Sequence, residues 1–218
     1  SLTKKKKINP LFCAIEYGYH DVVEKLLDMG ADAEIKGNIV NETPLYLCMR
    51  KLFILREPEL YRQKLITGLT DKDPLSQEAR RRYSAGFTDA YGDISQFAAI
   101  LKKPHKAPIL YAVADAMKEH VLSRFSNESI QRIIEALLKA GANPNTSHEN
   151  PTRGRTPLML AAQLDCAWAF ELMLKYEGDI NQQDYDGADC FDIAMSFKSK
   201  SVLQMLINLR KARDGFSS

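Results

Sequence analysis

The fold is decided by the stretch TPLMLAAQLDCAWAFELMLKYEGDIN, which spans residues 156–181. Thr156 can cap a helix that begins at Pro157, because a proline in the first turn loses no hydrogen bond there. Ala161 and Ala162 are small, so a second helix can approach closely. In the matching stretches at 22–27 and 133–138, apolar residues recur at i, i+1, i+4 and i+5, which indicates a helix with one core-facing stripe. The stretch therefore predicts a pair of helices joined by a short turn.

The same pattern recurs along the chain. Aligned without a gap, NPLFCAIEYGYHDVVEKLLDMGADAE around Pro10 matches the stretch around Pro157. Further copies open with ETPLYLCM at 42–49, APILYAVA at 107–114 and DGADCFDIAMSFKSKSVLQMLINL at 186–209. Pro10 and Pro44 lie 34 residues apart, and Pro157 lies 33 residues from Cys190, which replaces the proline. A period near 33 predicts helix pairs that bury their apolar faces by stacking on one another.

The Thr-Pro-Leu opening, the LLxxGA(D/N) ending and this period together resemble the ankyrin repeat. The resemblance implies an all-α ankyrin-repeat solenoid of about five helix-turn-helix repeats with two helical insertions. We expect a basic N-terminal tail at 1–7 and an ankyrin-repeat domain at 8–218. Its repeats are expected at about 8–41, 42–106, 107–154, 155–187 and 188–218, the last being a capping repeat. Irregular arrays of this kind are similar to the ankyrin proteins that intracellular bacteria secrete as effectors.

Two insertions interrupt the pattern, one at 50–92 in the second repeat and one at 115–128 in the third. Residues 93–103 are expected to be the delayed second helix of the second repeat, because DAYGDISQFAAILKK aligns with IEYGYHDVVEKLLDM. Both insertions fall between the first and the second helix, so they should lie side by side at one edge of the stack. Three alternatives stay open for them: they stabilise the stack, they form a specific contact surface, or they carry a catalytic feature.

A smaller departure concerns the end of the second helices. Gly30 and Gly141 stop these helices at a position that suits left-handed backbone, but Glu177 takes this position in the fourth repeat. The sequence leaves the geometry of that helix end open.

Composition and charge narrow the function. The 218 residues carry 30 basic and 28 acidic side chains, a formal charge of +2, which argues against a surface built for nucleic acid or membranes. No apolar run reaches the roughly 18 residues needed to span a bilayer. We expect no cofactor, no metal site and no small-molecule substrate, because the motifs for these are absent. The four cysteines form no C-x-x-C pair, which fits core residues in a reducing compartment.

The predicted function is a non-catalytic protein-interaction scaffold, and the resemblance places partner binding on the concave face. The candidate partner-binding residues lie on the loops between repeats and on the helices: Phe12, Lys36, Asn38, Tyr46, Arg50, Lys103, His105, Tyr111, His148, Arg153, Arg155, Met159, Gln163, Trp168, Gln183 and Tyr185. Trp168 is either an exposed anchor for a partner or a packing residue between repeats. The basic run Lys4–Lys7 is either a solvated edge or a nuclear-import or phosphate-contact segment.

An alternative function is the targeting domain of a larger enzyme whose catalytic domain lies outside these residues. That alternative rests on the likeness to secreted effectors, a fold-level analogy. The expected location is the cytoplasm, or the cytosol of a host cell if the protein is secreted.

Overall fold

The computed structural model describes residues 9–37, 42–62, 107–148 and 154–215. In these residues the regular structure is helical, and the only β pairing is an isolated bridge between His148 and Arg155. The all-α prediction is therefore confirmed. No helix of the described part combines the length and the apolarity that crossing a membrane requires.

The helices are α1 (Pro10–Glu16), α2 (His20–Asp28), α3 (Pro44–Arg56), α7 (Ala107–Leu122), α8 (Asn127–Lys139), α9 (Pro157–Gln163), α10 (Ala167–Lys175), α11 (Cys190–Ser196) and α12 (Lys200–Gly215). Those at both ends of the chain form the predicted pairs, α1 with α2, α9 with α10 and α11 with α12. The predicted caps are present, because the Thr43 hydroxyl accepts a bond from the Tyr46 N–H and the Thr156 hydroxyl accepts one from the Met159 N–H.

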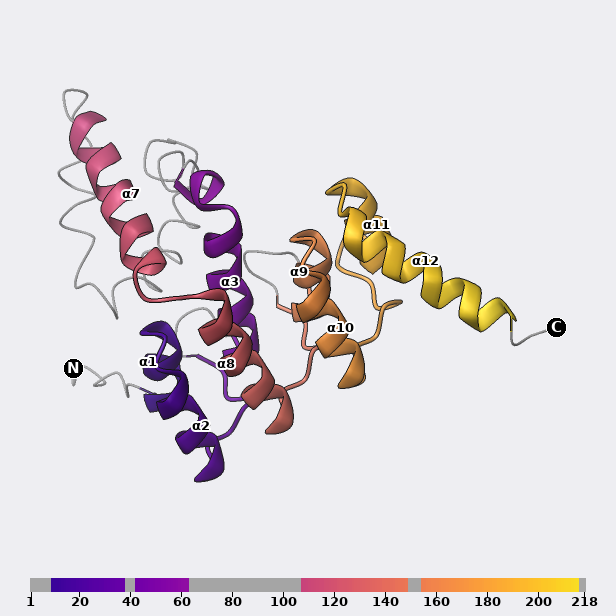
Figure 1. The fold of residues 1–218 in the computed structure, drawn as a ribbon, viewed down its shortest axis with the longest axis horizontal. Helices are drawn as coiled ribbons and strands as arrows, with labels where there is room; N and C mark the ends of the chain where they lie inside the picture. Colours follow the sequence, from indigo (N-terminus) through magenta and orange to yellow (C-terminus); the bar gives the residue numbers. More distant parts are fainter. Residues whose placement is uncertain (1–8, 38–41, 63–106, 149–153, 216–218) are drawn as a thin grey trace, which may run out of the picture.

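The helices form two layers. The first layer contains α1, α3, α9 and α11, each packed against the next, and the second layer contains α2, α8, α10 and α12 in the same order. Figure 1 shows the resulting helix pairs following one another along the long axis of the molecule. We call the loops that lead from one pair to the next the fingers; they comprise residues 29–43, 140–156 and 176–189. The core runs through the whole stack and includes fully buried Ile134, Leu137 and Phe170.

One helix pair differs from the predicted division into repeats. Helix α3 packs against α8, and α8 also contacts α2 and α10, so α8 takes the second-helix place beside α3. The sequence had suggested that α3 and α8 belong to successive repeats, with 93–103 as the partner of α3; residues 93–103 lie outside the described residues. Helix α7, expected to begin the third repeat, packs against α3. The contacts thus make α3 and α8 a single pair, separated in sequence by one long insertion that carries α7.

The end of the insertion, just before α8, packs against the turn between α1 and α2. The Arg124 guanidinium lies over the Tyr17 ring at 4.5 Å, and Phe125 is buried in the core. Lys51 of α3 is nearly buried, pairs with Glu16 of α1, and has its ammonium 5.7 Å from the centre of the Phe125 ring. Because a buried ammonium without its carboxylate would be costly, Glu16 and Lys51 hold the edge of the stack in one arrangement.

The second helices end as the glycines predict. Gly30 and Gly141 have φ of +86° and +93°, and Glu177 adopts the same left-handed region with φ of +63°. The following N–H groups of Ala31, Ala142 and Gly178 each bond back to a carbonyl five residues earlier. The geometry at Glu177 is therefore the regular one, held by a residue that tolerates it less well than glycine.

Candidate protein-interaction surface

The structure sorts the sixteen candidate residues into several groups. Asn38, Lys103, His105 and Arg153 lie outside the described residues, and so does the side chain of Tyr111 in α7. Lys36, Gln183 and Tyr185 are exposed on the fingers. The half-buried candidates are Phe12, Arg50, Arg155, Gln163 and Trp168.

Three candidates are buried, which corrects their assignment to an exposed contact face. Tyr46 and Met159 are 0% exposed, and His148 is 4% exposed. The finger carrying His148 folds over the start of α3, so that the His148 ring lies 3.9 Å from the Tyr46 ring and its Nε2 lies 3.2 Å from the Thr43 hydroxyl. Met159 lies in the first turn of α9, and its sulfur accepts a hydrogen bond from the N–H of Thr156, the residue before the helix, at 3.4 Å. These side chains support the surface from below and are not part of it.

His148 is held neutral in this position. Burial, together with the positive charge of Lys36, lowers the pKa of His148 to about 4. At neutral pH the imidazole is therefore uncharged.

Trp168 is not a fully exposed side chain. Its side chain is half-buried and packs against the hydrophobic core. Of the two interpretations left open by the sequence, packing accounts for the buried part of the ring.

Tyr185 lies at the tip of the last finger. The residue is 62% exposed, but its ring contacts Gly154 in the neighbouring finger. A Cβ atom at position 154 would lie 2.4 Å from Cδ1 of Tyr185, so only glycine permits this close approach. The ring is thus held against the protein on one side and offered to solvent on the other.

Arg155 lies next to Gly154 and is fixed by two partners. Its Nε donates to the Asp184 carboxylate at 3.3 Å, and its Nη1 donates to the Gln163 side-chain oxygen at 2.6 Å. The guanidinium also lies 5.4 Å from the centre of the Phe197 ring. Arg155 therefore joins α9, α11 and the last finger, and its side chain is ordered before any partner arrives.

Asp184 organises the finger that presents Tyr185. Its carboxylate accepts backbone bonds from Asp186 at 2.9 Å and from Ala188 at 3.0 Å, besides the bond from Arg155. Burial by itself raises the pKa of Asp184, but these backbone donors and Arg155 outweigh it and lower the pKa below its ordinary value. Gln183 and Tyr185 were predicted from the sequence, whereas Asp184 and Gly154 were not. The run Asp184-Tyr185-Asp186-Gly187, typical of a turn held by an aspartate, was the available signal.

The preceding helix pair carries an equivalent contact. Arg50 occupies in α3 the place that Gln163 occupies in α9, and its Nη1 donates to both carboxylate oxygens of Glu42, at 2.9 and 2.7 Å. Glu42 in turn precedes Thr43 as Arg155 precedes Thr156. The first helices are thus lined by side chains that are already paired with the fingers above them.

Two further observations concern metal binding and the cysteine thiols of the described residues. No group of His, Cys, Asp and Glu in the described part is arranged to hold a metal ion. Burial raises the pKa of Cys190 to about 12 and also raises the pKa of Cys48 and Cys166, which keeps these thiols protonated.

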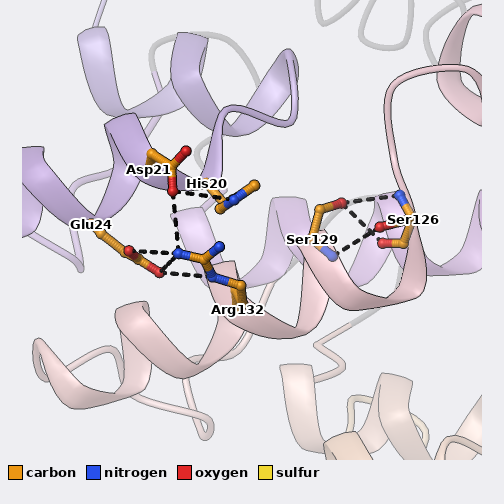
Figure 2. Close-up of polar contacts among 6 residues, drawn as sticks. All are labelled: His20, Asp21, Glu24, Ser126, Ser129 and Arg132. Carbon is orange, nitrogen blue, oxygen red and sulfur yellow. Dashed lines mark hydrogen bonds and ion pairs between the residues drawn. The ribbon is translucent and has the colours of Figure 1, made fainter.

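A shallow groove of about 440 Å³ lies between α2 and α8. Ion pairs cross it, because Arg132 of α8 donates to Glu24 at 3.0 Å and to Asp21 at 3.2 Å (Figure 2). At the start of α8, Ser126 and Ser129 cap the helix by bonding each other's backbone N–H. The ion pairs of Arg132 join two helix pairs, and the two serines stabilise the first turn of α8.

Comparisons with known proteins agree with this architecture. A family model described as ankyrin repeats in three copies matches residues 120–214, and a single ankyrin-repeat model matches residues 7–38. The mouse (Mus musculus) protein Rabankyrin-5 is 27% identical over 210 residues, which cover 90% of this chain and 17% of that protein. The chain thus spans about a sixth of the length of this relative. The matches give no indication of a secreted effector.

Proposed function

Because this chain belongs to the ankyrin-repeat family, whose repeats generally mediate protein–protein interaction, we propose that it is a non-catalytic scaffold that binds a partner protein. The contact surface consists of the fingers, the adjoining ends of the first helices and the insertion that carries α7. Within the described residues, the exposed contacts are Lys36, Gln183 and Tyr185.

The observation that carries this proposal is the way in which Tyr185 is presented. Tyrosine and arginine dominate the residues that contribute most to binding at protein interfaces. Here Tyr185 is 62% exposed, yet its ring contacts Gly154, and Arg155 beside it is held by Asp184 and Gln163. A partner that covers this ring pays little conformational entropy, because the side chain is already confined.

Arg155 has a different role from the one the sequence suggested. Since it is half-buried and bonded to Asp184, its removal would leave a buried carboxylate without its cation. We therefore assign Arg155 to positioning the finger, and Tyr185 to contacting the partner.

The test is quantitative affinity purification with the chain as bait, comparing Tyr185→Ala with the wild type. Leu209→Ala is the control, because Leu209 is 42% exposed and lies on α12, away from the fingers and from the insertion. We expect Tyr185→Ala to weaken the binding of a partner at least tenfold, about 1.4 kcal/mol, while Leu209→Ala leaves it unchanged. Equal retention of every partner by the wild type and Tyr185→Ala would refute the assignment of the surface.

A further inference from the structure

Each finger carries a hydrogen-bonding side chain four residues after the left-handed end of the second helix. These side chains are Glu34, Asn145 and Asn181. Glu34 reaches forward to the next finger, where its Oε1 accepts a bond from the N–H of Asn143 at 2.9 Å. Asn145 repeats this contact one finger further on, and its Oδ1 accepts a bond from the N–H of Asp179 at 2.8 Å. Asn143 and Asp179 hold the same position in their fingers, so the contact recurs in the same register.

Both side chains make a second bond, which holds the next finger at two points. Glu34 Oε2 accepts a bond from the Thr146 hydroxyl at 2.9 Å. Asn145 Nδ2 donates to the backbone oxygen of Glu177 at 2.8 Å. One partner of Asn145 thus donates and the other accepts, a combination that a carboxamide can serve and a carboxylate cannot. The two bonds of Asn145 fix both the position and the orientation of the chain that begins the last finger.

These bonds of Asn145 orient the finger more than they stabilise the fold. Glu177 and Asp179 are exposed, and Asn145 is half-buried. If the carboxamide is removed, water can bond the two backbone groups, so the free energy of unfolding should fall by only about 0.5–1.5 kcal/mol. Water cannot replace the fixed link between one finger and the next.

The position of this base matters at the tip of the finger. Further along, Gln182 Nε2 donates to the Ser147 hydroxyl at 3.0 Å, and at the tip the ring of Tyr185 contacts Gly154. The six residues from Asp179 to Tyr185 span at most about 20 Å, so a rotation of about 10° at the base would move the ring by up to about 3–4 Å. Contacts at the base and at the tip are both needed to place the ring.

We propose that Asn145 is a positioning residue of the contact surface. Through its two bonds it fixes the base of the last finger, and with it the place at which Tyr185 meets a partner. This inference rests on the function proposed above, because it takes Tyr185 as the contact residue. A finger that occupies its binding position only part of the time lowers the apparent affinity by that fraction. The loss falls on the association rate constant, whereas removal of the contact itself raises the dissociation rate constant.

The first test needs no partner and measures backbone order by ¹⁵N relaxation. In Asn145→Ala we expect the order parameters of residues 182–187 to fall from about 0.85, the value of rigid backbone, towards about 0.6. The nuclear Overhauser effect between the Tyr185 ring and Gly154 should weaken with them. Asn145→Asp should lose the same order, because its carboxylate cannot donate to the backbone oxygen of Glu177.

Asn181→Ala is the matched control. Asn181 holds the same repeat position on the last finger, but in the described part of the chain no finger follows it, since α12 continues to Gly215. This variant should keep the order of residues 182–187.

Three outcomes would overturn the role of Asn145. The first is unchanged order of residues 182–187 in Asn145→Ala or in Asn145→Asp. The second is an equal loss of order in Asn181→Ala, because any change at the base of the finger would then suffice. The third is a loss that extends through α9 and α10, because that result means weakened packing of the whole pair.

The second test uses surface plasmon resonance with a partner recovered by the affinity purification described above. Asn145→Ala should lower the association rate constant about three- to tenfold and leave the dissociation rate constant unchanged. Tyr185→Ala should raise the dissociation rate constant. If Tyr185→Ala binds like the wild type, the proposed contact is wrong, while the order parameters still decide the role of Asn145. If Tyr185→Ala dissociates faster and Asn145→Ala binds like the wild type, the proposed contact stands and the role of Asn145 is overturned.

Discussion

Substitution of Gly18 by alanine tests how the insertion is joined to the stack. Gly18 lies in the turn between α1 and α2, with φ of +72°. A Cβ atom at this position would lie 2.6 Å from the backbone carbonyl oxygen of Arg124, which belongs to the returning end of the insertion. Since a carbonyl cannot rotate away as a side chain can, the two segments must separate.

The expected cost has two parts. Placing alanine in the left-handed region costs about 1 kcal/mol. Forcing the overlap with a packed backbone costs a further 1–3 kcal/mol, roughly, as other overpacked sites do. We therefore expect Gly18→Ala to lower the free energy of unfolding by about 2–4 kcal/mol, a large share of the stability of a typical domain.

Gly30→Ala is the matched control. Gly30 has φ of +86°, but a Cβ atom there would meet nothing within 4 Å. Its substitution should cost only the backbone part, about 1 kcal/mol. The equivalents of Gly18 in the later pairs, Asp165 and Lys198, have φ of +50° and +58°, so side chains are tolerated where the insertion does not press on the turn.

The assay is equilibrium unfolding in urea, followed by far-ultraviolet circular dichroism and fitted with a common slope. Costs for Gly18→Ala and Gly30→Ala that agree within about 0.5 kcal/mol would refute the reasoning, because the contact with Arg124 would then contribute nothing.

Three further predictions use the same assay. In the first, residues 51–130 are replaced by a copy of the three-residue turn Leu164–Cys166. The shortened protein should still unfold in one cooperative transition, because the remaining parts of α3 and α8 keep their contacts with each other and with their neighbours. Loss of the helical signal would show that α3 and α8 are not one pair. Glu177→Gly should raise stability by about 0.5–1 kcal/mol by relieving left-handed backbone at φ of +63°; no gain in the urea midpoint would contradict this. Because the pKa of His148 is lowered to about 4 in the folded state, the unfolded chain binds the proton first as the pH falls below about 6.5. The wild type should therefore lose about 2–3 kcal/mol between pH 6.5 and pH 4, and His148→Gln should lose measurably less over the same range; parallel pH profiles would exclude His148 as the cause.

The local features were predictable because they depend on a few neighbouring residues. Thr43 and Thr156 cap their helices, and Gly30 and Gly141 end theirs, as expected from residue type alone. The exposed positions on the fingers, Lys36, Gln183 and Tyr185, were also placed correctly on the surface.

The burial of candidate side chains was less predictable. Tyr46 and His148 carry the polar groups that suggest a contact surface, but each covers the other in the interior. Nothing in either local sequence reveals this, because the two residues lie about a hundred positions apart and meet only when the finger closes over α3. The same holds for Gly154, whose role depends on its contact with the ring of Tyr185, about thirty positions further along the chain.

The amino-acid sequence by itself determined that this chain forms ankyrin-type helix pairs, because capping residues, helical periodicity and left-handed stops act over a few positions and recur with each repeat. Only the tertiary structure decided which helices form a pair. The opening of α7 resembles that of a first helix, yet α7 packs on the side of α3, and the place beside α3 is filled by α8, 70 residues further along the chain. The physical reason is that a first helix can bury its stripe against any second helix of matching shape. Which second helix pairs with α3 depends on the contacts that α8 makes with α2, α3 and α10 at the same time. Residues that are neighbours in the sequence do not reveal the combined energy of these contacts.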